Sequence, residues 1–232
     1  MDNVKKTQEF FDSNFRKLER TKEKKQLDII KATEASLKNK LSGKVLDIGS
    51  GGKMHYSTHG INELICADMS FQSLEKARED NKVECIITDA RNLALCDNSF
   101  DCVVILHTLH HLAGNSAVDT RKNVLRCLKE SHRVLKEEGK ILIIDAFCKK
   151  IMERVEDLFH NTFFFIFENF GKPMVHYFSL IHITEALRQS GFKNITFSYL
   201  DTGNAKLCPF ASSRGIPFKY TPVFHVLIEA VA

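Results

Sequence analysis

An apolar run that ends in an acid and a cluster of glycines is the part of this sequence best suited to binding a ligand. Residues 45–52 read Val-Leu-Asp-Ile-Gly-Ser-Gly-Gly, and a second apolar run ends at Asp68. Glycine reaches positive φ at little cost and lets the backbone approach a ligand closely. An acid at the end of the neighbouring strand can accept hydrogen bonds from both hydroxyls of a ribose. The pattern therefore predicts a nucleoside site at the edge of a parallel sheet.

The spacing of the glycines does not favour a dinucleotide. A pyrophosphate site needs the pattern G-x-G-x-x-G at the start of a helix, where free N–H groups and the helix dipole meet the phosphate charge. Met54 stands where the last glycine of that pattern would be. Asp47 would repel a phosphate, so the turn suits a cation or an amino group instead.

Five segments of the chain resemble, in the correct order, the motifs of the class I S-adenosylmethionine-dependent methyltransferases. The match is to the branch of the ubiquinone and menaquinone biosynthesis enzymes, and it spans about residues 40–146. The sequence departs from the family at Lys53, where many members have a third glycine. The five segments are residues 45–52, Asp68 with Met69, Thr88-Asp89-Ala90, residues 100–112 and residues 133–143.

The resemblance implies a role for each residue at the predicted sheet edge. Asp68 would hold the ribose, Met69 would pack on the adenine, and the segment after the third strand would bind the edge of the adenine ring. Asp47 would accept hydrogen bonds from the glycine turn or from the ammonium group of the cofactor. An alternative role for Asp89 is to cap the turn that follows it. The implied cofactor contacts are Asp47, Gly49, Ser50, Gly51, Asp68, Met69, Asp89, Ala90 and Leu106.

Histidines follow the fourth predicted strand, next to where the methyl group would emerge. The sulfonium is already an activated methyl donor, so the enzyme must mainly align the nucleophile and exclude water, and such positioning can lower a barrier by ~7–11 kcal/mol. A general base adds ~10²–10⁴-fold when the nucleophile is a hydroxyl or an acidic C–H. Histidine suits this task because its unperturbed pKa is ~6.5. We predict His107 or His110 as the base, with a structural role as the alternative.

Three further residues are predicted to contact the substrate, and no metal is expected. His111 adjoins the predicted base, whereas His176 and Tyr177 lie in a later segment that could close over the site. The alternative for His176 is a partly buried histidine of a lid. No acid or cysteine stands at a recognised ligand spacing from the histidines, so the sequence does not predict a metal site.

Strands alternate with helices from about residue 41 onward, which predicts a parallel sheet and the α/β class. The resemblance implies a Rossmann-like, doubly wound sheet of seven strands in the order 3-2-1-4-5-7-6, with one strand antiparallel. A helical leader, residues 1–40, precedes the methyltransferase domain, residues 41–232. In the family such a leader often folds over the cofactor. We expect a helix near residues 52–59 to make the first crossover.

Local signals place several other elements. Ser116 can cap a helix that runs to about Lys136, because its hydroxyl can accept from an unpaired N–H of the first turn. The continuous apolar run from Ile141 to Ile144 is typical of a central strand that is buried on both faces. The connection over about residues 201–222 is too long for a tight turn, and we expect it to form part of the substrate mouth.

The segment of about residues 147–180 is predicted to be a lid rich in phenylalanine. It carries eight of the 18 phenylalanines of the chain. Residues 159, 163, 167 and 170 recur at helical spacing and predict a stripe that faces the core. Phe164 and Phe165 lie off that stripe, so this second apolar face favours a substrate pocket or a contact between two copies of the chain.

Charge and composition favour a small, partly apolar organic substrate. The net charge of +4 is mild, and a solvated helix face explains the cations of the leader, so we expect no nucleic-acid partner. An RNA methyltransferase and a catalytically silent subunit that binds S-adenosylmethionine remain the alternatives. The seven cysteines contain no C-x-x-C pair, no signal peptide is visible, and no apolar run reaches the ~20 residues that cross a bilayer. We therefore expect a cytoplasmic protein without a transmembrane segment.

Overall fold

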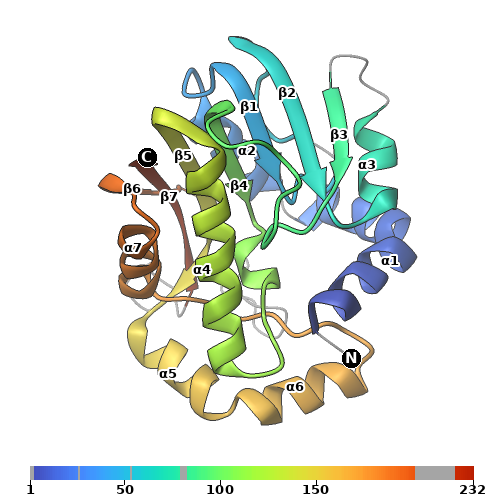
Figure 1. The fold of residues 1–232 in the computed structure, drawn as a ribbon. Helices are drawn as coiled ribbons and strands as arrows, with labels where there is room; N and C mark the ends of the chain where they lie inside the picture. The colour runs from blue at the N-terminus through green and yellow to red at the C-terminus, as the bar shows by residue number, and fades with distance from the viewer. Residues whose placement is uncertain (1–2, 26, 53, 79–82, 202–222) are drawn as a thin grey trace.

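The computed structural model describes residues 3–25, 27–52, 54–78, 83–201 and 223–232. Lys53 and most of the connection predicted to form the substrate mouth, residues 202–222, lie outside the described residues. A seven-stranded sheet crosses the molecule with helices packed against both faces (Figure 1). Within the described residues, no helix combines the length and the apolar character needed to cross a membrane.

The strand order is β3-β2-β1-β4-β5-β7-β6, which confirms the predicted order and the α/β class. Neighbouring strands run parallel from β3 to β5, and β7 is antiparallel to both β5 and β6. The strands are β1 Gly43–Ile48, β2 Ile61–Asp68, β3 Val83–Ile87, β4 Phe100–Leu106, β5 Leu135–Cys148, β6 Lys193–Tyr199 and β7 Val223–Val231.

Seven α-helices and one turn of 3-10 helix, Leu109–His111, are present in the described part of the chain. Ser116 caps α4 as predicted, because its hydroxyl accepts from the Asp119 N–H at 3.1 Å. The helices are α1 Asn3–Lys25, α2 Leu27–Leu37, α3 Phe71–Ala77, α4 Ala117–Val134, α5 Lys150–Leu158, α6 His160–Asn169 and α7 Leu180–Gln189.

The sheet separates two apolar clusters, because successive side chains of a strand point to opposite faces. On one face, Leu46 and Ile48 of β1 belong to a cluster that includes residues of α4 and α7. On the other face, Val45 belongs to a cluster that includes Leu37 of α2 and Leu74 of α3. The central strands are therefore covered on both sides, and the open edge at their carboxyl ends is where polar groups can gather.

The prediction of a helix near residues 52–59 is wrong. The described residues between β1 and β2 form turns and irregular backbone. Gly51 and Gly52 have φ values of 60° and 77°, outside the helical region. A Cβ on Gly52 would lie 2.1 Å from the Ser73 carbonyl oxygen, so the turn is pressed against α3. Tyr56 then enters the apolar cluster on that face, and an irregular loop makes the first crossover.

The leader helix α1 lies across the carboxyl ends of the strands (Figure 1). The Gln8 Nε2 donates to the Met69 carbonyl at 2.9 Å, and the Ser70 hydroxyl donates to Asp12 Oδ1 at 2.6 Å. The Asn3 Nδ2 donates to the Ala113 carbonyl at 2.7 Å. These contacts fix the start of α1 over the segments that follow β2 and β4.

The prediction that residues 159, 163, 167 and 170 of the lid form a stripe facing the core is also wrong. Phe159 and Phe170 are 49% and 70% exposed, and only the side chains at positions 163 and 167 are half-buried. The stripe spans α6 from its N-cap, Phe159, to its C-cap, Phe170. The side chains at these two caps face solvent, so only the middle of the stripe, at positions 163 and 167, is partly covered.

Candidate functional site

The carboxyl ends of four parallel strands meet at one edge of the sheet. In the register of β1, Ile48 pairs with Ala67 of β2 and with Ile105 of β4. The residues just beyond are the glycine turn, Asp68 and Leu106, so they lie side by side at this edge. Leu106, half-buried at the end of β4, pairs in turn with Ile144 of β5.

Asp47 is a buried carboxylate with one satisfied oxygen. Its Oδ2 accepts from the Tyr56 hydroxyl at 2.6 Å, whereas Oδ1 is buried without a hydrogen-bond partner among the described residues. Burial raises the pKa of Asp47 to about 7; the Tyr56 hydrogen bond opposes this, and the nearby charge of Asp68 adds to it. An unpaired buried carboxylate oxygen suits a proton, an N–H group or a cation.

The glycine turn that follows β1 combines close packing with open space. A Cβ on Gly49 would lie 2.4 Å from the Thr108 side chain, so only glycine lets the loop after β4 come this near. A Cβ on Gly51 would meet nothing closer than the Gly49 carbonyl oxygen at 4.0 Å. Gly51 therefore borders a space that a side chain would fill, whereas Ser50 between the two glycines is half-buried.

Asp68 joins the glycine turn to the start of α3. Its Oδ2 accepts from the Gly51 N–H at 3.0 Å and its Oδ1 from the Ser70 N–H at 2.8 Å. Burial raises the pKa of Asp68, although these backbone hydrogen bonds act in the opposite direction. Each carboxylate oxygen can accept a second hydrogen bond, so both remain able to hold a diol. Met69 follows, half-buried beneath Gln8 of α1.

Asp89 accepts hydrogen bonds from Arg91, as expected for an acid that caps a turn. The Arg91 backbone N–H donates to its Oδ1 at 2.8 Å, and the guanidinium binds both oxygens at 2.7–3.0 Å. Partial burial opposes ionisation, but Arg91 outweighs it and lowers the pKa of Asp89. Ala90 beside it is half-buried against the core. An adenine amino group would have to share the Asp89 carboxylate with Arg91.

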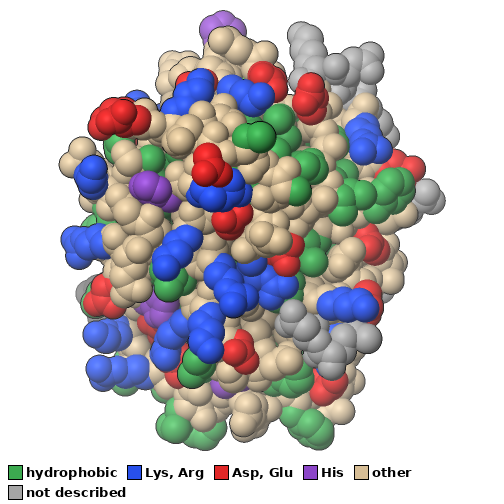
Figure 2. Space-filling model, viewed as in Figure 1, with side chains coloured by type: hydrophobic (Ala, Val, Ile, Leu, Met, Phe, Trp, Pro, Cys, Tyr) green, Lys and Arg blue, Asp and Glu red, His purple; other side chains and the backbone are tan. Residues whose placement is uncertain are grey.

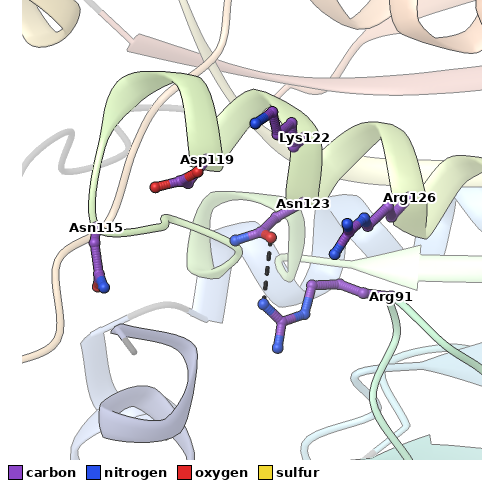
Figure 3. A pocket seen from close by; sticks show the side chains of 6 residues that line it. All are labelled: Arg91, Asn115, Asp119, Lys122, Asn123 and Arg126. Atoms are coloured by element: carbon purple, nitrogen blue, oxygen red, sulfur yellow. Dashed lines mark hydrogen bonds between the residues drawn. The ribbon is translucent and has the colours of Figure 1, made fainter. Parts of the chain in front are cut away.

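A polar cavity of about 320 Å³ opens beside Arg91 on the face of α4 (Figure 3). The Arg91 Nη1 donates to Asn123 Oδ1 at 3.2 Å. Lys122 and Arg126 also line this cavity, and neither forms an ion pair with a described residue. The other two lining side chains are Asn115 and Asp119. The cavity excludes Asp47, Gly51 and Asp68, so it is separate from the glycine turn.

His107 ends β4 in an unusual backbone conformation. Its φ is 51°, in the left-handed region that residues other than glycine rarely adopt. The His107 N–H donates to the Ile144 carbonyl at 2.7 Å, which ties the turn to β5. Its ring centroid lies 5.6 Å from that of His225 on β7. His225 is 9% exposed, and burial lowers its pKa.

His110 forms a close pair with a buried carboxylate on β5. The distance between His110 Nδ1 and Asp145 Oδ1 is 2.6 Å, and Asp145 is 1% exposed. Burial opposes ionisation of Asp145, but the interactions with His110 and His107 outweigh it and lower its pKa to about 2. A carboxylate at Nδ1 fixes the orientation and tautomer of an imidazole and leaves Nε2 to exchange a proton. Asp145 was not predicted from the sequence.

Aromatic rings from the leader and the lid enclose this pair. The ring of His111 lies 4.1 Å from that of His110, and Phe11 of α1 meets His111 edge-on at 5.0 Å. Tyr177, which follows the lid helices, stacks on His110 with centroids 5.7 Å apart. Segments from two distant parts of the chain thus close over one histidine.

His176 lies away from open space. It is 0% exposed, and its Nδ1 is 3.4 Å from Glu156 Oε2. Burial lowers the pKa of His176 to about 4. Its backbone N–H donates to the His110 carbonyl at 3.0 Å, so it fastens the lid to the histidine loop. Among the residues that the structure describes, no group of three or more histidine, cysteine, aspartate or glutamate side chains is placed to hold a metal ion.

The central part of the chain matches the model of a known protein family. Residues 46–143 match the profile described as "Methyltransferase domain". A ubiquinone/menaquinone biosynthesis C-methyltransferase of Haemophilus ducreyi is 24% identical over 186 residues, which cover 69% of this chain and 68% of that protein. A demethylmenaquinone methyltransferase of Lactobacillus johnsonii is 29% identical over 129 residues. That match covers 50% of this chain and spans about half, 48%, of the relative.

Solved structures share the fold at lower sequence identity. The chain resembles the methyltransferase in a complex with the Haloferax volcanii Trm112 activator, with a TM-score of 0.69, 15% identity and 97% of each chain covered. It also resembles an S-adenosylmethionine-dependent methyltransferase of Thermotoga maritima, with a TM-score of 0.64 and 19% identity. That alignment covers 97% of this chain and 99% of the other. At these identities the likeness supports the fold alone.

Proposed function

Since this chain is a class I S-adenosylmethionine-dependent methyltransferase, we propose that it methylates a small, partly apolar organic molecule. The observation that carries the proposal is the enclosure of the His110–Asp145 pair by Phe11, His111 and Tyr177. Aromatic rings from the leader and the lid at this site would offer a small molecule apolar contacts.

The residues at the sheet edge fit the cofactor. Gly51 borders open space, Asp68 can accept from the ribose hydroxyls, and the unpaired oxygen of Asp47 can accept from the glycine turn or an ammonium group. When bound, S-adenosylmethionine supplies an activated methyl group on its sulfonium, and S-adenosylhomocysteine is the product. We assign cofactor contacts to Asp47, Gly49, Ser50, Gly51, Asp68, Met69, Asp89, Ala90 and Leu106.

Of the two predicted bases, we favour His110. Asp145 holds Nδ1 of His110, so the opposite nitrogen, Nε2, is left to accept a proton from the acceptor group. The backbone of His107 is anchored to β5, its ring lies 5.6 Å from that of His225, and it interacts with the charge of Asp145. We assign His107 to positioning this pair, His111 and Tyr177 to substrate contact, and the enclosed His176 to support of the lid.

An experiment with labelled cofactor tests the choice of substrate. The protein is incubated with S-adenosylmethionine labelled in its methyl group and with either a metabolite extract or total RNA. We expect label in a small apolar product and no label in RNA. Label in RNA alone would contradict the proposal. The Asp145→Asn variant, which should still bind the cofactor, controls for transfer that does not depend on the site.

An RNA methyltransferase is the second candidate, and the cavity beside Arg91 favours it. Arg91, Lys122 and Arg126 line this cavity with a single acid, Asp119, which is a lining suited to phosphate. If RNA is the substrate, its binding should weaken steeply with salt. Loss of that binding in Lys122→Gln/Arg126→Gln, with cofactor binding unchanged, would support this candidate over the small-molecule proposal.

A catalytically silent subunit is the third candidate. It is favoured by the similar protein whose structure includes a methyltransferase activator. Cofactor binding without methyl transfer to any extract fraction, with or without added partner proteins, would distinguish it. A homodimer formed through the Phe-rich lid would be one assembly of such a subunit. We place the protein in the cytoplasm, in keeping with free thiols at the six described cysteines.

A further inference from the structure

Among the described residues, most of the large apolar side chains that are exposed to solvent belong to the lid. Of fourteen such side chains, eight lie between Ile151 and Phe170. Four of them are more than half exposed: Ile151 at 61%, Leu158 at 78%, Phe165 at 64% and Phe170 at 70%. Exposed apolar residues scattered singly need no explanation, but a continuous set on two adjacent helices marks an interaction surface.

All the acids of α5 point away from this surface. Glu153 is 5% exposed, and its carboxylate lies 2.7 Å from His182 Nδ1 and accepts from Ser179. Glu156 accepts from the Tyr177 N–H at 2.9 Å, and Asp157 pairs with Arg121 of α4. The three acids of α5 therefore contact α4, α7 and the segment after α6, whereas in an ordinary amphipathic helix the apolar side would face inward.

Two exposed cations of α5 lie between its acids and its exposed apolar side chains, at a groove that Glu153 and Asp157 also line. Lys150 and Arg154 are exposed and form no ion pair with a described residue. They lie four residues apart, and Leu158 follows after four more, so one side of the helix presents all three. Figure 2 shows hydrophobic side chains along the lower rim, where Figure 1 places α5 and α6, with Lys and Arg on the same face of the molecule.

We propose that the outer face of α5 and α6 docks on an anionic lipid bilayer. Apolar side chains on a helix that lies in the interface insert between lipids, and cations beside them are attracted to anionic headgroups. The lid surface formed by Ile151, Leu158, Phe165 and Phe170, with Lys150 and Arg154, has this composition. Because the acids of α5 are turned inward, they do not repel a negative surface.

A second copy of the chain fits this surface less well. In a symmetric dimer the same patch contacts itself, so Lys150 and Arg154 of both copies would lie in one interface. Like charges oppose that contact, whereas a bilayer with anionic lipids neutralises them. The lid also carries Tyr177 to the candidate base, so docking would turn the mouth of the site toward the bilayer. Docking is measured without methyl transfer, so it can fail independently of the proposed substrate.

Vesicle cosedimentation tests the proposal. The full chain is mixed with vesicles of phosphatidylcholine alone or of phosphatidylcholine and phosphatidylglycerol in equal parts. We expect binding to the anionic vesicles, much weaker binding to the neutral ones, and loss of binding at high salt. Lys150→Gln/Arg154→Gln should weaken binding by about fivefold for each cation. Leu158→Ser/Phe165→Ser should weaken it by about tenfold or more.

Matched variants elsewhere on the surface serve as controls. Phe197→Ser removes a 50% exposed phenylalanine from β6, and Lys129→Gln/Lys140→Gln removes two exposed cations from α4 and β5. Both should bind vesicles like the wild type. Cofactor binding and thermal unfolding, measured on every variant, report whether the fold is intact.

Two results would overturn the proposal. The first is that the wild type sediments equally with anionic and with neutral vesicles, or that the lid variants sediment with anionic vesicles as much as the wild type does. The second is a dimer in light scattering that Leu158→Ser/Phe165→Ser separates into monomers while vesicles take up no protein. In that case the lid surface joins two copies of the chain.

Discussion

Two buried aspartates in this protein have pKa values shifted in opposite directions. Asp47 and Asp145 are each 1% exposed. Burial raises the pKa of Asp47 to about 7, because the Tyr56 hydroxyl is its only partner among the described residues and Asp68 adds negative charge. Around Asp145 the two histidines outweigh burial and lower the pKa to about 2. Asp47 is therefore prepared to gain a proton or a cation, whereas Asp145 is a fixed anion that orients His110.

Replacing Asp145 tests the proposed base. In Asp145→Asn the imidazole of His110 loses the carboxylate that fixes its tautomer, so we expect kcat for methyl transfer to fall by ~10²–10⁴-fold. The Kd for S-adenosylmethionine should stay within about twofold, since Asp145 lies outside the assigned cofactor contacts. Asp101→Asn, an exposed acid paired with Lys136 at the opposite end of β4, is the control. A kcat within threefold of the wild type would show that His110 does not act through this pair.

The stability of the cofactor-free protein should depend on pH through Asp47. A pKa raised from 3.8 to about 7 means that the protonated form is favoured in the folded state. The stabilisation from this group is complete below about pH 4 and is lost as the pH rises through about 7. Asp47→Asn removes this dependence, so the melting temperature of the variant relative to the wild type should rise between pH 5 and pH 8.

Thermal unfolding of both proteins at the two pH values measures this effect. Glu156, whose pKa burial also raises to about 7, is present in both proteins and cancels in the difference. A difference in melting temperature that is the same at pH 5 and pH 8 would contradict the assignment.

At the scale of elements, the turn after β1 decides where the chain can bind a ligand. Gly49 and Gly52 are held by contacts to Thr108 and to α3, whereas Gly51 faces open space. The turn is therefore rigid on two sides and accessible on the third. Packing decides which glycines contact neighbouring segments and which one borders open space, and the sequence alone does not reveal this.

Two glycines with the same backbone conformation allow the effect of backbone strain to be distinguished from the effect of filling the proposed ligand site. Gly51 and Gly171 have φ values of 60° and 61°, and neither has an atom close to the position of a Cβ. Alanine at either should therefore cost about the same, ~1–2 kcal/mol of unfolding free energy, because both adopt the left-handed conformation. Only Gly51→Ala should weaken binding of S-adenosylmethionine, by tenfold or more, as its methyl group enters the proposed ligand space.

Denaturant unfolding and calorimetry of the two variants measure these quantities. Equal cofactor affinity in Gly51→Ala and Gly171→Ala would show that the ligand does not pass close to Gly51.

The regular elements were predictable because local signals and long-range packing agree in them. The apolar run at Ile141–Ile144 lies in β5, and Ser116 caps α4. The helix near residues 52–59 was not predictable, because the contact of Gly52 with Ser73 outweighs local helical preference. The stripe at residues 159–170 failed for a different reason: helical spacing does not reveal that Phe159 and Phe170, the caps of α6, face solvent.

At the scale of the whole molecule, the site is built by segments that are far apart in the sequence. Asn3 binds the Met174 carbonyl at 3.2 Å, and Lys6 pairs with Glu168, so α1 and α6 meet over the sheet edge. The glycine turn and Asp68 were predictable because a short motif carries them. Asp145 and His225 were not, because each is a polar residue inside an apolar strand. Only the pairing of β5 with β4 and β7 brings them beside the histidines.

The proposed function requires a nucleoside cofactor held at the carboxyl ends of β1 and β2. Calorimetric titration of the wild type, Asp68→Asn and the control Asp101→Asn with S-adenosylmethionine tests it most directly. We expect saturable binding to the wild type and to Asp101→Asn, and affinity at least tenfold lower in Asp68→Asn, because the ribose loses a charged hydrogen-bond acceptor. No binding to the wild type at millimolar cofactor, or equal affinity in all three proteins, would contradict the account.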